Sequence, residues 1–141
     1  MRSLILALAL LGAIAPSAAQ DSQYQNLLTP LLSGNTTIID QTIAYPDGTP
    51  KVTAAIVVIP PGKDTGWHTH AVPLFVYILE GEVTVDYGSK GMKVYKAGEA
   101  LLEAENWPHN GMNETDELVR IFAVYMGGEG IANATPVAGA E

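Results

Sequence analysis

Three histidines are the residues of this 141-residue chain best suited to chemistry. His68 and His70 lie two positions apart, and His109 is the only other imidazole. Side chains two apart in a strand point to the same face, so both rings can reach one ion. Neutral imidazole binds zinc and first-row transition metals, and the chain has no cysteine to supply a thiolate. A His-x-His pair alone is more often a pair of exposed or hydrogen-bonded histidines than a metal site.

Aromatic and amide side chains flank the histidines in the sequence. We predict that four aromatic side chains form an apolar substrate pocket at the metal, namely Trp67, Phe75, Tyr77 and Trp107. Tyr77 is the candidate catalytic residue among them, because its phenol can carry a proton. Core packing is the competing interpretation of each aromatic side chain. Asn110 and Asn113 are predicted to support the site by hydrogen bonds to the His109 ring or to its backbone.

The segments that must position these residues have the pattern of short β-strands. The expected strands cover residues 36–45, 51–59, 75–79, 82–87, 92–96, 100–103 and 117–126. Glycine and proline separate them, and only a helical turn or two is expected before them, between Tyr24 and Leu32. These features predict an all-β fold, either a sandwich or a closed barrel.

The N-terminal residues have the pattern of a signal peptide. Arg2 supplies a positive charge, an apolar run extends from Leu4 to Ile14, and the small residues Ser17 and Ala19 follow. The run is shorter than the roughly 20 residues of a membrane-spanning helix, which disfavours an uncleaved anchor. We therefore expect cleavage after Ala19 and a periplasmic or secreted mature protein without a membrane span.

The chain is expected to contain one folded domain between two less structured segments. We predict a signal peptide at residues 1–19, an N-terminal segment at 20–35, a barrel at 36–126 and a flexible tail at 127–141. The formal net charge is -8. An acidic field of this kind repels nucleic acid, so no nucleic-acid partner is expected.

Two stretches of the sequence carry a recognisable spacing. The first contains Gly62, His68, His70 and Gly81, and the second contains Gly98, His109 and Asn113. They resemble the two motifs of the cupins, and the chain is most similar to small single-domain cupins (type 2) of the quercetin-dioxygenase-like group. The resemblance implies a double-stranded β-helix, the jelly-roll cupin barrel, with His68, His70 and His109 holding one divalent metal ion. It also implies a homodimer, since small cupins often pair by extending a sheet.

The sequence departs from the cupin pattern in two places. Leu74 occupies the position of the family's glutamate ligand, and residues 104–106 replace its Pro-x-Gly. The resemblance therefore implies a shell of three histidines, around iron, manganese, nickel, copper or zinc. Glu103 or Glu105, just upstream of His109, is the alternative source of a carboxylate ligand. A barrel that has lost its metal is the remaining alternative.

A three-histidine shell with open coordination positions suits three functions. The resemblance implies a metal-dependent, dioxygenase-like enzyme that acts on a small molecule. The alternatives are a non-catalytic module that binds a small molecule or the metal, and an isomerase or lyase with Tyr77 or Glu103 as acid and base. The sequence has no pattern of a serine–histidine–acid triad or of a phosphate-binding glycine loop, so covalent nucleophilic catalysis is not expected. The substrate is left open.

Overall fold

The structure, a computed structural model, describes residues 24–138 and consists almost entirely of β-strands. The strands are β1 (Pro50–Ile59), β2 (His68–Thr69), β3 (Leu74–Glu80), β4 (Glu82–Asp86), β5 (Met92–Lys96), β6 (Ala100–Leu102), β7 (Asn110–Met112), β8 (Val119–Gly128) and β9 (Thr135–Pro136). A 3-10 turn, η1 (Gly88–Lys90), precedes β5. Contacts divide the chain into residues 1–30 and residues 31–141, and every strand belongs to the second unit. The predicted all-β fold is confirmed.

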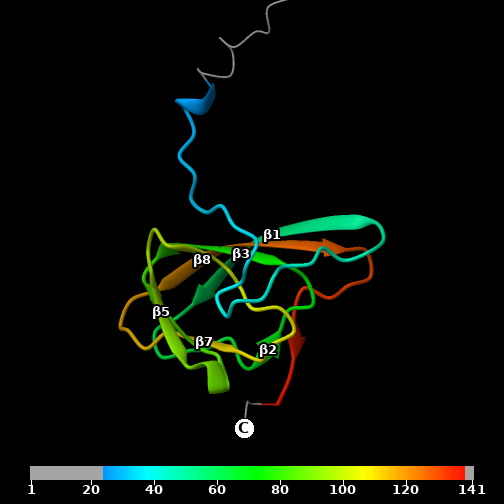
Figure 1. The fold of residues 1–141 in the computed structure, drawn as a ribbon. Coiled ribbons are helices and arrows are strands. Elements are labelled where there is room, and N and C mark those ends of the chain that lie inside the picture. The colour runs from blue at the N-terminus through cyan, green and yellow to red at the C-terminus, as the bar shows by residue number, and fades with distance from the viewer. Residues whose placement is uncertain (1–23, 139–141) are drawn as a thin grey trace, which may run out of the picture. The chain divides into compact units, whose positions relative to one another are not determined.

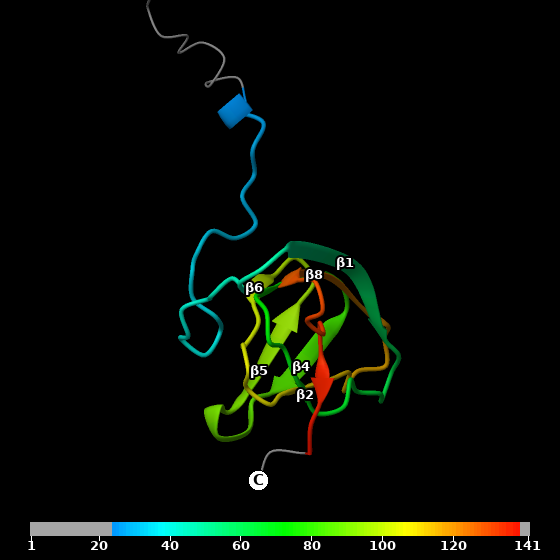
Figure 2. The same ribbon diagram turned by 90° about the vertical axis from the view of Figure 1, so that its right-hand side faces the viewer.

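The strands form two antiparallel sheets and a two-stranded ribbon. The larger sheet has the order β1-β8-β3-β6 and the smaller one the order β5-β4-β7, while β2 pairs with β9. Figure 1 shows β1, β8 and β3 side by side, with β5 and β7 in the other part of the barrel. Figure 2 shows β2 beside β9, the red strand near the C-terminus.

Alternating side chains send one face of each strand into a shared core. The inward side chains of β3 are Leu74, Val76 and Ile78, each at most 7% exposed. They join Val83 and Val85 of β4 in one hydrophobic cluster. Burial of an aliphatic side chain of this size contributes about 1.5–3 kcal/mol. This cluster therefore holds the two sheets together.

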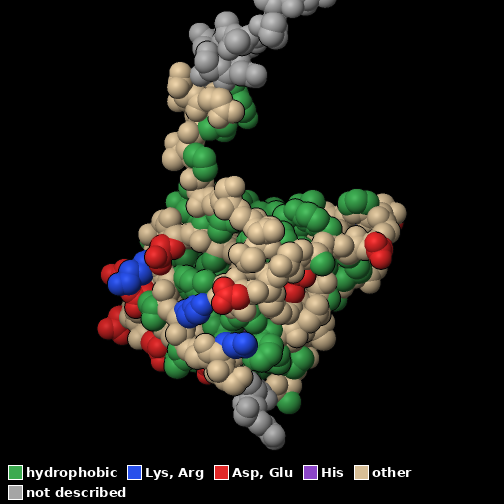
Figure 3. Space-filling model, in the orientation of Figure 1, with side chains coloured by type: hydrophobic (Ala, Val, Ile, Leu, Met, Phe, Trp, Pro, Cys, Tyr) green, Lys and Arg blue, Asp and Glu red, His purple; other side chains and the backbone are tan. Residues whose placement is uncertain are grey.

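The outer face of the larger sheet is also apolar. Val52, Ile56 and Val58 of β1 are 67%, 46% and 50% exposed. Phe122 of β8 lies opposite Ile56 in the register, so the apolar face continues onto the next strand. Figure 3 shows hydrophobic side chains along the side of the molecule where Figure 1 places β1. The larger sheet thus carries apolar side chains on both faces.

Gly81 lies where the chain passes from the larger sheet into the smaller one. Its φ of +78° is in the left-handed region, and a Cβ there would lie 2.5 Å from the carbonyl oxygen of Leu118. Any other residue would be strained in its backbone and would collide with that oxygen. The register of β3 against β8 also shifts between Ile78 and Glu80, so the chain bends at this point.

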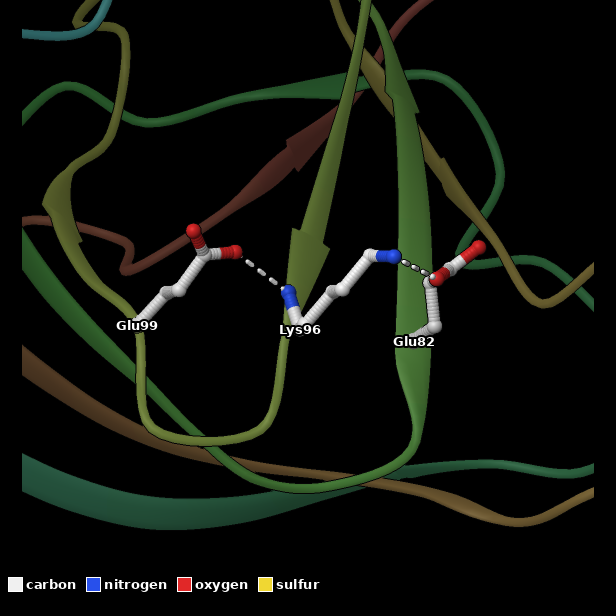
Figure 4. A network of polar contacts seen from close by, with 3 residues as sticks. All are labelled: Glu82, Lys96 and Glu99. Carbon is white, nitrogen blue, oxygen red and sulfur yellow. Dashed lines mark hydrogen bonds and ion pairs between the residues drawn. The ribbon is translucent and has the colours of Figure 1, made fainter.

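The β4–β5 hairpin ends in the polar network of Figure 4. The Lys96 ammonium lies 3.2 Å from a carboxylate oxygen of Glu82 on the paired strand. The Lys96 backbone N–H donates to the Glu99 carboxylate at 2.6 Å, across the turn that contains Gly98. The ion pair is exposed and contributes at most about 1 kcal/mol. Backbone pairing therefore defines this hairpin more than charge does, and the Glu99 hydrogen bond shapes the turn from β5 to β6.

The strand predicted at residues 36–45 is wrong. Thr36 and Thr42 form a single bridge around a tight turn, in which the Thr37 N–H donates to the Gln41 carbonyl at 2.8 Å. Asp40, inside the turn, has a φ of +65°, which a continuous strand does not allow. The β-branched residues favour an extended chain, but the hydrogen bonds of this turn reverse it.

The tail predicted to be flexible from residue 127 onward is structured as far as residue 138. β8 continues to Gly128, the Glu129 N–H donates to the Thr49 carbonyl, and β9 places Pro136 opposite His68. The prediction is therefore wrong for residues 127–138. Small side chains suggested a loose segment, but backbone hydrogen bonds to neighbouring strands do not depend on side-chain size.

The predicted signal peptide at residues 1–19 and its cleavage site lie outside the described residues. Of the predicted N-terminal segment, the described part begins with a helical turn at residues 24–25. Across residues 24–138, no helix combines the length and the hydropathy needed to cross a bilayer.

Candidate metal centre

Backbone pairing brings the three histidines together. His68 begins β2, His70 follows that strand, and His109 immediately precedes β7. The backbones of His68 and His109 exchange two N–H···O hydrogen bonds, each of 3.0 Å. One ligand nitrogen from each ring lies within 4.8 Å of the other two. The convergence predicted from the sequence is confirmed.

Each imidazole is held by a hydrogen bond between its Nδ1 atom and a backbone carbonyl. The acceptors are the carbonyl oxygens of Gly66 for His68 (2.7 Å), Asn133 for His70 (2.7 Å) and Trp107 for His109 (2.9 Å). A carbonyl oxygen only accepts, so each Nδ1 carries the hydrogen and each Nε2 carries the lone pair. These hydrogen bonds fix the tautomer and leave Nε2 as the ligand atom.

Burial favours the neutral form of the three rings. It lowers the pKa of His70 to about 3, although the hydrogen bond to the Asn133 carbonyl opposes the shift. Burial also lowers the pKa of His68 and the pKa of His109. Only a neutral imidazole offers its lone pair to a metal ion. Three neutral nitrogen donors on converging rings therefore fit one divalent ion of the transition-metal or zinc type.

Glu103 lies close to the histidines but outside the converging group. Its side chain is 6% exposed and forms part of the same cavity wall. Burial raises the pKa of its carboxyl, against the effect of the Ala104 N–H, which donates to Oε1 at 2.7 Å. Among the described residues, the group able to hold an ion here consists of histidines alone. The alternative ligand Glu103 is therefore not in place to coordinate in this conformation.

Glu105 is connected to the site through its backbone. It forms a parallel bridge with His70, and the Asn106 N–H donates to the His70 carbonyl at 2.7 Å. Its Oε1 atom is buried and has no hydrogen-bond partner in the described part of the chain, and burial raises the pKa of the carboxyl. The Glu105 side chain does not line the cavity of the histidines. It supports the loop that carries His70 and contributes no ligand atom.

A cavity of about 350 Å³ lies between the sheets, and the three histidines form part of its wall. Aliphatic side chains from β1, β3, β4, β6 and β8 make up most of the remainder. Leu74, at the position where the resemblance implies a glutamate, is one of them. The metal-binding nitrogens therefore belong to an apolar chamber of the size that takes a small molecule.

Phe75 and Tyr77 do not line this cavity, and their predicted pocket role is corrected. They alternate along β3 with Leu74 and Val76, which face inward. Neighbouring side chains of a strand point to opposite faces, so Phe75 and Tyr77 lie on the outer face of the sheet. The position of Tyr77 is therefore incompatible with the catalytic role predicted for it.

The two tryptophans also lie outside the cavity wall. Trp107 packs against the hydrophobic core, and Trp67 is half-buried next to β2. The aromatic side chains that line the cavity are Tyr95 and Tyr125, which the sequence analysis did not select. The Tyr125 ring centre lies 5.5 Å from that of His70. The predicted aromatic pocket is therefore replaced by an aliphatic one with two phenols.

Asn110 and Asn113 organise loops and do not bond the His109 ring, whose Nδ1 is already paired with the Trp107 carbonyl. The Asn110 Oδ1 accepts from the Thr65 hydroxyl at 3.3 Å. The Asn113 amide donates to the Ile59 carbonyl at 2.9 Å and is 1% exposed. Both amides fasten the second motif to the segment that leads from β1 to β2.

The C-terminal segment forms part of the site, which the sequence analysis missed. Asn133 supplies the carbonyl that holds His70, and Ala134 and Pro136 line the cavity. The Val137 N–H donates to the Trp67 carbonyl at 3.0 Å, which secures the segment beside β2. Composition gave no signal for this, because the contacts depend on backbone atoms and on a small side chain next to the histidines.

Comparison with known proteins identifies the family and the fold. The model of the cupin domain family matches residues 55–125, which include the three histidines. No curated protein matches the chain. A conserved protein of uncharacterised function with a double-stranded β-helix domain, from Klebsiella pneumoniae, has a TM-score of 0.54 and 17% identity, covering 81% of this chain and 93% of that one.

Two enzymes share the same fold over part of their length. The oxalate decarboxylase of Bacillus subtilis, described with Mn(II) centres, has a TM-score of 0.51 and 19% identity, covering 61% of this chain and 24% of its own. The DMSP lyase DddQ of Ruegeria pomeroyi has a TM-score of 0.54 and 19% identity, with 61% and 43% covered. This chain thus spans less than half the length of either enzyme. The likeness confirms the double-stranded β-helix.

The family match covers half of the chain and includes strands of both sheets and all three histidines. Within residues 31–138 the strands form one barrel. The chain belongs to the cupin family, as a small single-domain member.

Proposed function

We propose that this protein is an exported, metal-dependent, dioxygenase-like enzyme that acts on a small molecule beside His68, His70 and His109. One observation carries the proposal. The three Nδ1 atoms are bound to carbonyl oxygens, so the free nitrogens of the rings converge in the wall of an apolar cavity. A purely structural histidine would use both nitrogens within the fold, because buried polar atoms are normally paired.

The chain's own residues supply orientation and an apolar environment. The carbonyl hydrogen bonds hold the rings, and Leu74 in place of a carboxylate keeps the protein shell neutral. When bound, a divalent iron or manganese ion supplies Lewis-acid polarisation and redox chemistry with oxygen. The Mn(II) centres of the Bacillus subtilis oxalate decarboxylase, which shares the fold, support manganese as one candidate.

A second candidate function is that of a lyase or isomerase, and the position of Glu103 favours it. Its carboxyl lines the cavity, and burial raises its pKa, which favours the protonated form next to the histidines. A group of this kind can donate a proton to a bound molecule and take one from it. The fold shared with the DMSP lyase of Ruegeria pomeroyi is consistent with this second candidate.

The metal shell is tested by metal content. We expect wild-type protein to bind about one equivalent of Fe(II) or Mn(II). Stoichiometric binding is expected to be lost in each of the variants His68→Ala, His70→Ala and His109→Ala, because the two imidazoles that remain are too few ligands. Leu74→Glu adds a carboxylate at the cavity wall and tightens binding. Glu103→Gln is the matched control and keeps the metal. Full occupancy in His109→Ala, or metal loss in Glu103→Gln, would mean that the shell is assigned wrongly.

Oxygen uptake by the loaded protein then separates the functions. An electrode assay over a panel of small molecules is expected to show substrate-dependent uptake by the Fe(II) protein and none by His70→Ala. Substrate conversion without oxygen uptake, abolished in Glu103→Gln, would identify the lyase or isomerase instead. If the protein binds metal but converts no molecule of the panel, the result would identify it as a non-catalytic binding module.

The C-terminal segment is expected to tighten metal binding. Ending the chain after Ile131 removes the Asn133 carbonyl that holds His70. Loss of such an orienting partner weakens metal affinity by about 10–100-fold. Deletion of residues 139–141 is the control, because it keeps Val137 and its hydrogen bond to Trp67. Calorimetric titration with Zn(II) measures both, and equal affinities would contradict the role given to residue 133.

Export is the part of the proposal that rests on the N-terminal sequence alone. Arg2, the apolar run from Leu4 to Ile14 and the small residues before Gln20 support it. Intact mass of the protein from its own host is expected to correspond to a chain that begins at Gln20. A mass that retains Met1 would remove the argument for export.

We also propose that the protein forms a homodimer through the outer face of the larger sheet. β1 is a ten-residue edge strand that pairs only with β8 among the described strands, and its outward side chains are apolar. Water is excluded from this exposed apolar face when the same face of a second copy packs against it across a two-fold axis.

Ile56→Lys is expected to convert this dimer into a monomer, because it buries a charge at the centre of the apolar face. Val94→Lys on β5 is the control, since Val94 is 49% exposed on the smaller sheet, close to the 46% of Ile56. Light scattering measures the mass of each. A monomeric wild type, or equal masses for the two variants, would count against the dimer.

A further inference from the structure

The cavity wall carries no cationic side chain. None of the six lysines and arginines between residues 24 and 138 belongs to it. The ionisable groups that do belong to the wall are His68, His70, His109, Glu103, Tyr95 and Tyr125. Apart from the histidines, none of these groups becomes positively charged.

The nearby cations are engaged elsewhere. The Lys93 ammonium donates to the carbonyl of Ile38, and Lys96 pairs with Glu82 at the far end of the hairpin. The Lys90 ammonium lies over the Trp107 ring, 5.5 Å from its centre. A ligand in the cavity therefore has no lysine or arginine from residues 24–138 to pair with.

The rest of the wall is aliphatic. Val57, Ile59, Val76, Val85, Leu101 and Ile121 contribute side chains from strands of both sheets. A charged group that leaves water for such a surface loses its hydration and gains no partner. An uncharged hydrocarbon or aromatic group gains from the same transfer. The wall therefore selects against charge in the part of a ligand that lies beyond the histidines.

We propose that this site takes a small molecule with an uncharged, apolar body and with oxygen donors at the end that faces the three histidines. The proposal rests on the proposed function for the metal at that end, and on the aliphatic wall for the rest of the molecule. Molecules with a second charged group, such as dicarboxylates, are excluded by the same wall. The volume of about 350 Å³ lies at the lower end of small-molecule sites and suits a compact body.

A matched pair of probes tests the body of the ligand. 4-Methylcatechol and 3,4-dihydroxybenzoate share the same oxygen donors and differ in a methyl group against a carboxylate. Calorimetric titration of the Zn(II)-loaded protein, in which no redox reaction occurs, is expected to show at least about tenfold tighter binding of 4-methylcatechol, a difference of about 1.4 kcal/mol. Equal affinities, tighter binding of the benzoate, or binding of neither would overturn the proposal.

The same pair is titrated into metal-free protein to separate this inference from the metal site. Preference for the methyl compound is expected to persist there with weaker affinity, because it comes from the aliphatic wall. If the protein fails to bind Zn(II) but keeps the preference, the proposed function fails and the ligand class stands. If Zn(II) binds stoichiometrically and the preference is absent, the ligand class fails and the metal site stands.

Two lysine variants locate the origin of the preference. Ile121→Lys adds a cation to the cavity wall at a half-buried position, and Val94→Lys adds the same charge at an exposed position of β5, outside the cavity wall and outside the proposed dimer face. The first is expected to bind 3,4-dihydroxybenzoate about tenfold more tightly than wild type, and the second to match wild type. An equal gain in both variants would assign the discrimination to net charge and contradict the proposal. If Ile121→Lys does not fold, the probe pair on wild type still decides.

Discussion

The hydrogen bonds between the three Nδ1 atoms and backbone carbonyls are the constraint on which the site depends. Two of them are local, because Gly66 and Trp107 each lie two residues before the histidine that they hold. The third links His70 to Asn133, 63 residues away. The loops before His68 and His109 can thus orient their own rings, whereas the orientation of His70 requires the folded C-terminal segment.

Burial and neutrality reinforce each other in this cavity. The aliphatic wall lowers the pKa of His70 and raises that of the Glu103 carboxyl, so both groups favour their uncharged forms. Leu74 removes the carboxylate that would otherwise carry a charge. The protein therefore offers an ion three neutral donors and offers the remainder of a ligand an apolar surface. Charge at this site comes from the ion and from the ligand atoms next to it.

The sequence predicted the barrel and the convergence of the histidines, because both follow from short-range patterns. Strand alternation and glycine–proline turns defined the all-β fold, and the His-x-His spacing placed two rings on one face. The same alternation argues against Tyr77. Leu74 occupies the position where the resemblance implies a ligand that faces inward, and Tyr77 is three residues further along the same strand. An odd separation places the Tyr77 side chain on the opposite, outer face. By that parity Tyr125, an even number of residues from Ile121 and Ala123, faces inward.

Other features of the site depend on contacts that no local pattern encodes. Residues 36–45 are β-branched, yet the turn that contains Asp40 prevents a strand. Residues 133–136 have no distinctive composition, and their role depends on pairing with β2 at long range. Whether a given cation lies in or near the cavity also depends on how its side chain is directed by the fold. The apolar wall could therefore not be predicted from the sequence, because it depends on how the two sheets pack against each other.

The C-terminal segment connects the two halves of the site through one piece of backbone. The carbonyl of Asn133 holds a ligand ring, while the next residue, Ala134, and Pro136 form part of the wall that a bound molecule would contact. A displacement of this segment therefore changes the orientation of His70 and the shape of the cavity together. Binding of an ion favours the conformation in which the ring is held, and a ligand that packs on Ala134 and Pro136 favours the same conformation. By linkage each then strengthens the other, even without direct contact between the ligand's apolar body and the ion.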